Sequence, residues 1–256
     1  MIYNIKVIQK KEVIILWENM YSVINCESHI HLFGFVHLTV FSITMIISYL
    51  ISKYKLNAES FIKLFLLITL CSHMLLYAWY YMNPLETIFE KGLPFYTCRM
   101  TLYLLIAGIL FDKKSCLKLG VYWGFFGGLA GLVFPTMFKY PFPHIQTISV
   151  FLLHSSIFIT GNYYLFVKKI GMNKQDLKNC SICTLIFLIF VTIFNIIVGS
   201  SYSATTRMPA HLINFGINVP ASFCSIAVIF GYLVAIFLMY LLVNDYKYGK
   251  VKEKVE

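Results

Sequence analysis

The chain has 256 residues, of which 59% are hydrophobic and only 12% are charged, and its mean hydropathy is +0.75. These values lie far outside those of a soluble globular domain and predict an integral membrane protein. The net charge of +10 does not indicate nucleic-acid binding, because the basic residues are dispersed over several loops and no soluble reading module accompanies them. The charge instead favours attraction to an anionic membrane surface.

Residues 1–32 lack the basic start, apolar core and cleavage site of a signal peptide. Their mixed charge and Trp17 predict a segment that lies at the membrane interface. Residues 33–243 then carry about seven apolar runs, each near the ~20 residues that a helix needs to cross a bilayer. They predict an all-α, polytopic membrane helix bundle. The expected spans are Phe33–Ser52, Ser60–Tyr81, Leu93–Phe111, Leu117–Phe134, Ile145–Val167, Ser181–Gly199 and Val219–Val243.

The loops between these spans differ in charge. Most of the 21 lysines and arginines fall on one side of the bundle when the spans are threaded in order. Basic loops stay in the cytoplasm, so we expect an outside N-terminus and a cytoplasmic C-terminus, with residues 244–256 as a basic cytoplasmic tail. The expected location is the cell (cytoplasmic) membrane. The outer loops are rich in proline and aromatic residues, which is typical of the mouth of a site.

Four polar residues are expected at similar depths in four spans. Counted from the charged cytoplasmic helix ends, Cys98 and His154 lie about 21 Å from the inner border, and His37 and Asn195 about 24–25 Å from it. Ionisable groups inside a span are functional candidates, and this layer combines a nucleophile with a base. The opposing interpretation is structural, with interhelical hydrogen bonds and an inert, packed cysteine.

The other cysteine patterns are weaker. Cys26 and Cys98 both face the outer half, so a disulfide between them is an alternative that would remove the nucleophile. The stretch CESHIH offers metal ligands at residues 26–31, but no second cluster fixes a geometry, so we predict no metal site and no cofactor. Cys180 and Cys183 have the spacing of a redox motif without its fold.

The fourth span is marked by small residues. They predict a face on which neighbouring helices approach closely, and they say little about chemistry. These glycines are at positions 120, 124, 127, 128 and 131.

Several stretches, from Phe33 to about Pro220, resemble a known family. They are LPFYTCRMTLYL, FKYPFPHIQTISVFLLHSSIFI, FGFVH and NIIVGSSY. These stretches resemble the YwaF-like bacterial integral membrane proteins, whose eukaryotic relative is a transmembrane acyltransferase that makes polyunsaturated ether phospholipids. In that enzyme a cysteine at the start of one span acts with a histidine two spans later, and the matching positions here are Cys98 and His154.

The resemblance implies a thiol-dependent lipid acyltransferase. Cys98 would form an acyl-cysteine with His154 as the base, and the acyl group would pass to a lysophospholipid-like acceptor. Membrane phospholipids and fatty acyl chains would be the partners, while the oligomeric state stays open. A more distant group, the androgen-induced membrane hydrolases of fatty acid esters, uses threonine, which keeps Thr101 and ester hydrolysis as alternatives.

Four further residues are expected to bind substrate. His37 and Asn195 would orient groups or donate to an oxyanion, and Arg207 would hold a phosphate. Tyr202 lies in a motif that departs from the family pattern in the residues around it, which bears on acceptor specificity. The alternative function is a non-enzymatic transporter or lipid-binding scaffold in which the same layer binds substrate. No inverted repeat relates the two halves, which weakens the transporter interpretation.

Overall fold

The computed structural model describes residues 34–82, 88–135, 142–208, 213 and 219–244. The expected interfacial segment, residues 1–32, and nearly all of the expected tail, residues 244–256, lie outside this part of the chain. Within it, the regular structure consists of helices and contains no strand. The prediction of an all-α helix bundle is therefore confirmed.

Helices occupy each of the places where a span was expected. Six of them are long and apolar enough to cross a membrane, whereas α4 has only 14 residues. The chain is thus a multi-pass bundle with α4 as a shorter apolar helix. The helices are α2 (Phe35–Tyr54), α3 (Glu59–Met82), α4 (Thr97–Leu110), α5 (Lys114–Val133), α6 (Ile145–Asn162) with its π-helical end η2 (Tyr163–Val167), α7 (Lys174–Val198) and α9 (Ala221–Val243).

The third helix begins later than the expected start at Leu93. Residues 93–96 form turns, and Tyr96 has extended backbone angles of φ −72° and ψ 130°, so the helix begins at Thr97. Two short helical turns, η1 (Ile88–Gly92) and η3 (Tyr202–Ala204), lie in the connections near this end of the bundle. The consequence is that Cys98 lies in the first turn of its helix.

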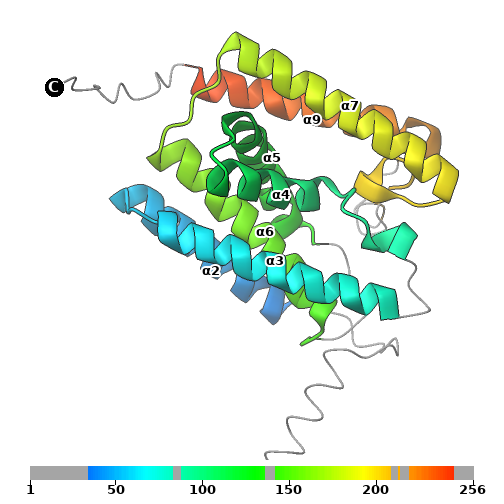
Figure 1. Cartoon of the computed structure of the whole chain (residues 1–256), viewed down its shortest axis with the longest axis horizontal. Coiled ribbons are helices and arrows are strands. Elements are labelled where there is room, and N and C mark those ends of the chain that lie inside the picture. The colour runs from blue at the N-terminus through cyan, green and yellow to red at the C-terminus, as the bar shows by residue number, and fades with distance from the viewer. Residues whose placement is uncertain (1–33, 83–87, 136–141, 209–212, 214–218, 245–256) are drawn as a thin grey trace, which may run out of the picture.

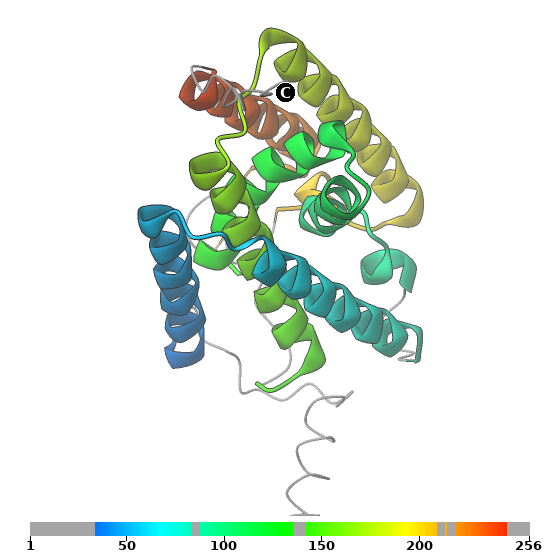
Figure 2. The ribbon, with the colours of Figure 1, turned by 60° about the vertical axis from the view of Figure 1, so that its left-hand side comes forward.

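The bundle is built around α5 and α6. Helix α5 packs against α4 and α6, and α6 in turn contacts both α2 and α3. Helices α7 and α9 pair with each other on the other side of α5 (Figure 1). Figure 2 shows α2 and α3 separated by α6, so these two outer helices are joined mainly through it.

Glycines allow α5 to approach both of its neighbours. A Cβ atom at Gly124 would lie 2.9 Å from the carbonyl oxygen of Ile157 in α6 and 3.3 Å from the methyl group of Thr101 in α4. A Cβ atom at Gly128 would lie 2.8 Å from the Cβ of Phe158. These separations are too short for a side chain, so the predicted close-packing face is confirmed.

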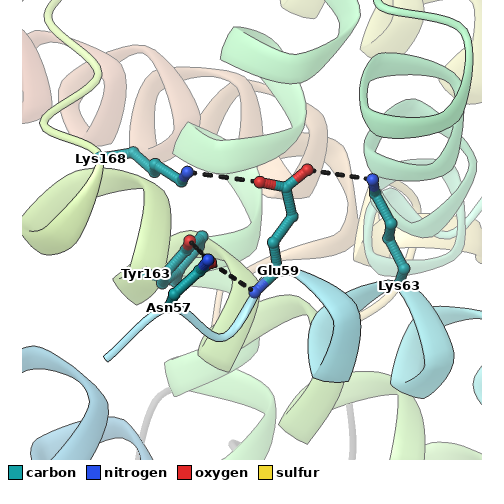
Figure 3. A network of polar contacts seen from close by, with 5 residues as sticks. All are labelled: Asn57, Glu59, Lys63, Tyr163 and Lys168. Carbon is teal, nitrogen blue, oxygen red and sulfur yellow. Dashed lines mark hydrogen bonds and ion pairs between the residues drawn. The ribbon is translucent and has the colours of Figure 1, made fainter. Parts of the chain in front are cut away.

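A polar network joins the α2–α3 connection to the end of η2 (Figure 3). Glu59 contacts Lys63 at 3.0 Å and Lys168 at 3.3 Å, and Asn57 Oδ1 accepts a hydrogen bond from the hydroxyl of Tyr163 at 3.4 Å. Burial acts to lower the pKa of Lys168, but its hydrogen bonds to Tyr163 and Glu59 raise it, and the net shift is upward. Lys168 is therefore a charged partner of Glu59 at neutral pH.

The exposure of this network predicts a small contribution to stability. The side chains of Glu59 and Lys168 are 39% and 42% exposed, so we expect Glu59→Gln to lower the free energy of unfolding by no more than about 1 kcal/mol. Asp176→Asn is the comparison, because Asp176 pairs with Lys118 at 2.6 Å with side chains only 17–18% exposed, and also completes the N-terminal cap of α7. Melting temperatures in detergent should fall more for Asp176→Asn. An equal fall for both variants would contradict this ranking.

Candidate functional site

Cys98 is a half-buried free thiol in the first turn of α4. Two other parts of the chain hold this turn. The N–H of Thr97 donates to Ser203 Oγ at 2.9 Å, and the Ser203 hydroxyl donates to the carbonyl of Phe95 at 2.9 Å. The hydroxyl of Thr97 is also hydrogen-bonded to that of Tyr232 in α9. The backbone that carries the thiol is therefore fixed from both η3 and α9.

Ser203 is a residue that sequence reasoning missed. It has a left-handed backbone with φ +54°, and the next residue, Ala204, has φ +58°. This conformation is unfavourable for residues with a side chain, so the contacts of the loop must compensate for it. A serine within a run of small polar residues has no pattern of its own, and only the fold reveals that it caps α4.

His154 is 8% exposed and lies against α5. Its Nδ1 is 2.8 Å from the carbonyl oxygen of Val150. A carbonyl only accepts, so in the neutral ring Nδ1 carries the proton and Nε2 keeps its lone pair. A Cβ atom at Gly131 would lie 1.9 Å from His154 Cδ2 and 2.2 Å from Nε2. The imidazole therefore occupies space that exists only because residue 131 is glycine.

The two predicted catalytic residues, Cys98 and His154, both contact helix α5. Cys98 Sγ lies 3.9 Å from where a Cβ of Gly127 would be, and the His154 ring lies at Gly131. Residues four apart on a helix share a face, with Cβ positions about 5–6 Å apart. Cys98 and His154 therefore meet the same strip of α5 on neighbouring turns. Among the hydrogen bonds of the described residues, none joins the thiol to the imidazole.

His37 lies beside this strip. Its Nε2 is 2.6 Å from the carbonyl oxygen of Leu132, and its ring stacks on that of Phe151 with centroids 6.2 Å apart. Leu132 follows Gly131, and Phe151 precedes His154 by less than one helical turn. The structure therefore brings His37 to the same end of α5 as His154, with its Nε2 engaged by the helix backbone.

Asn195 faces the loop that follows α7. Its Nδ2 donates to the carbonyl of Tyr202 at 2.9 Å and to Thr205 Oγ1 at 2.8 Å. Its Oδ1 accepts from Ser200 Oγ at 2.6 Å and from the N–H of Tyr202 at 2.9 Å. Both amide protons are therefore used to order residues 200–205. The structure does not bring this side chain to Cys98 and His154.

Tyr202 is fully buried and connects two loops. Its hydroxyl donates to the carbonyl of Phe89 at 2.9 Å and accepts from the N–H of Leu93 at 3.0 Å. Its ring also packs edge-on against those of Phe95 and Tyr96, at 5.7 and 4.9 Å between centroids. Tyr202 thus supports the turn that precedes α4.

The chain has two arginines, and they differ in burial and in their contacts. Arg207 is exposed and donates to the carbonyl of Gly199, at the end of α7, at 2.5 Å. Arg99 is only 6% exposed and donates to the carbonyls of Lys91 at 2.5 Å and Leu93 at 3.0 Å. Its guanidinium also lies 4.8, 5.4 and 5.8 Å from three tyrosine rings, those of Tyr96, Tyr77 and Tyr80.

The surroundings of Arg99 are unusual because no carboxylate of the described residues forms an ion pair with it. Cation–π contacts and carbonyl hydrogen bonds take that place. Next to it in the sequence, Cys98 instead lies against Gly127 of α5. Sequence reasoning considered Arg99 only as a neighbour of the thiol, and its anchoring role was missed.

The alternatives to Cys98 can also be placed. Thr101 is 1% exposed, and its hydroxyl donates to the carbonyl of Thr97 at 2.8 Å. Cys180 is buried and Cys183 exposed, and both are free thiols. Residues 26–31, which carry Cys26 and the histidines of CESHIH, lie outside the described residues. In the part of the chain that the structure covers, His, Cys, Asp and Glu form no cluster able to hold a metal.

Together these features define a multi-pass helical membrane protein with a thiol and an imidazole against the same end of one central helix. A model of the TMEM164 family matches residues 26–244. The chain therefore belongs to the TMEM164 family, a transmembrane protein family. No curated protein and no solved structure matches the chain.

Proposed function

We propose that the protein is a membrane-embedded, thiol-dependent lipid acyltransferase. It would transfer a fatty acyl group to a lysophospholipid-like acceptor through an acyl-Cys98 intermediate. The observation that carries the proposal is that Cys98 of α4 and His154 of α6 contact neighbouring turns on one face of α5. The resemblance to the YwaF-like proteins and their acyltransferase relative independently selects the same two residues.

The first half-reaction forms a thioester. Nε2 of His154 takes the proton of the Cys98 thiol, and the thiolate adds to the ester carbonyl of a phospholipid. The tetrahedral intermediate then breaks its bond to the glycerol oxygen, which leaves as a lysophospholipid hydroxyl after His154 returns the proton. The hydrogen bond from Nδ1 to Val150 supports this role, because it directs the lone pair to Nε2.

The start of α4 supplies donors for the oxyanion. The N–H groups in the first turn of a helix have no carbonyl partner one turn earlier, and they lie at the positive end of the helix dipole. Here the N–H of Thr97 already donates to Ser203 Oγ, and the N–H of Met100 donates to the carbonyl of Tyr96 at 3.0 Å. We assign the N–H groups of Cys98 and Arg99, between these two, to the oxyanion.

The second half-reaction transfers the acyl group. A lysophospholipid hydroxyl gives its proton to His154 and attacks the thioester, and the Cys98 thiolate leaves and is reprotonated. Water in place of the lipid would make the protein an ester hydrolase. We assign His37 to the wall beside His154, and Tyr202 and Asn195 to the ordering of the loops around α4. Arg207, exposed at the end of α7, is the proposed contact for a lipid phosphate.

The proposal is tested by intact-protein mass spectrometry after incubation with phospholipid in detergent. We expect a hydroxylamine-labile acyl adduct that is absent from Cys98→Ala. Adduct formation should slow by about 10²–10⁴-fold in His154→Ala, the usual contribution of a general base. Cys116→Ala is the matched control, because Cys116 is also a half-buried free thiol but lies near the other end of α5. Its adduct should equal that of the natural protein.

Two results together would contradict the proposal. An unmodified natural protein, together with cellular lipids that neither substitution changes, would return Cys98 to a packing role. The transporter or lipid-binding scaffold would then be the better account of the same residues.

A further inference from the structure

A cavity of about 300 Å³, open to the surface of the bundle, lies between α5 and α9, and Gly231 is exposed in it. Helix α5 is at the centre of the bundle, and α9 contacts it from the side on which α9 pairs with α7 (Figure 1). We infer that this cavity binds a single fatty acyl chain whose carboxyl end lies at Cys98. The inference rests on the proposed function, since it names the place of the acyl group in that reaction.

The cavity borders the thiol at one end. Three of the residues that line it, Gly127, Ser203 and Tyr232, also surround the first turn of α4. In the part of the chain that the structure describes, Cys98 Sγ is the only neighbour within 4 Å of a Cβ position at Gly127, while Ser203 and Tyr232 are hydrogen-bonded to Thr97. A chain attached to Sγ would therefore enter the cavity directly past Gly127.

The lining suits a hydrocarbon and little else. Beyond that first turn it consists of aromatic, aliphatic and glycine residues, and the hydroxyl of Tyr122 is already donated to the carbonyl of Gly171 at 3.1 Å. The cavity thus offers few hydrogen bonds to a polar solute. Its volume is at the lower end of the about 300–1,000 Å³ typical of ligand pockets, which fits one chain better than a whole lipid.

Gly231 sets the width of the cavity on the α9 side. Among the described residues, no atom lies within 4 Å of the position of its Cβ, whereas the α5 glycines at 124, 128 and 131 touch a neighbouring helix. Helix packing therefore does not require a glycine at residue 231, although a glycine weakens a helix interior. What the missing side chain provides is open space in the cavity. We expect Gly231 to determine which chain lengths are accepted.

The first experiment measures chain-length preference. The natural protein and Gly231→Leu are incubated with an equimolar mixture of phosphatidylcholines of short and long acyl chains, and the adducts are resolved by intact mass. Gly231→Leu should lower the ratio of long to short adducts at least tenfold. Ala235→Leu, which fills the same cavity from the next turn, should act in the same direction if Gly231→Leu does not fold. Ala227→Leu adds the same group at an exposed position of α9 outside the cavity, and should leave the ratio unchanged.

A second experiment separates chain binding from catalysis. A diazirine-labelled fatty acid is photocrosslinked to the Cys98→Ala protein, and the modified peptides are mapped. Crosslinks in α5 and α9 that are lost in Gly231→Leu would support binding of the acyl chain in the cavity. This holds even if no adduct forms on the natural protein and the acyltransferase proposal fails. An adduct whose chain-length ratio both cavity variants leave unchanged, with crosslinks on other helices, would overturn the inference and leave the proposed function standing.

Discussion

Replacing Gly131 by alanine should abolish most of the proposed acylation of Cys98, although it adds a single methyl group to a residue with no chemistry of its own. The new Cβ would fall 1.9 Å from Cδ2 of His154 and 2.2 Å from Nε2. The imidazole must rotate away, which breaks its hydrogen bond to Val150 and moves Nε2 off the face of α5 that Cys98 also contacts. We expect adduct formation to slow by about 10²–10⁴-fold, as for loss of the base itself. Time courses of intact mass measure the rate.

A double substitution shows whether the effect passes through the ring. In a His154→Ala background there is no imidazole to displace, so Gly131→Ala should cause no further loss of rate. Its melting temperature should rise in that background, because alanine stabilises a helix interior by about 1 kcal/mol relative to glycine. Independent, additive losses in the double variant would show that Gly131 acts on something other than His154.

Arg99→Met should produce the largest loss of stability of any single substitution considered for this chain. It removes charged hydrogen bonds to the carbonyls of Lys91 and Leu93, and the guanidinium contacts with the three tyrosine rings. Charged hydrogen bonds contribute about 1.5–3 kcal/mol each and cation–π contacts about 0.5–2 kcal/mol, so the total loss should exceed about 3 kcal/mol. For a chain of this size the melting temperature should fall by roughly 10 °C.

Arg207→Met is the matched control for this experiment. Its guanidinium is exposed and makes one hydrogen bond to the described residues, to the carbonyl of Gly199, so we expect a loss within about 1 kcal/mol. Arg99→Lys should resemble Arg99→Met more than the natural protein, because an ammonium lacks the planar fork that reaches both carbonyls and stacks on the rings. Equal melting temperatures for Arg99→Met and Arg207→Met would refute the anchoring role.

Hydrophobic patterning was sufficient to predict the helices. The expected span Ile145–Val167 coincides with α6 and η2 together, since both of its ends are marked by polar residues. The start of α4 was wrong by four residues because the apolar pattern continues through Leu93 and Phe95, which pack in turns. Apolar composition in a membrane protein reports burial or lipid contact, and it does not separate a helix from a turn that tertiary contacts hold.

Depth along the helices could be counted from the sequence, but direction around them could not. The count placed Cys98, His154, His37 and Asn195 in one layer, and the first three do lie against α5. Asn195 instead turns toward Tyr202 and Thr205, because a local loop offers it partners for every amide atom. The role of Gly131 could not be predicted either, because this glycine matters only through the space that it leaves for the His154 ring.

The shortness of α4 has a consequence for the choice of acceptor. Fourteen residues rise about 21 Å, whereas the hydrocarbon core is about 30 Å thick, so a helix anchored by the charges after Leu110 ends well below the opposite headgroups. A thioester on Cys98 would therefore form at a depth where the activity of water is low. Lipid hydroxyls that partition to this level would outcompete hydrolysis without any specific device to exclude water. Partitioning would thus favour transfer over ester hydrolysis.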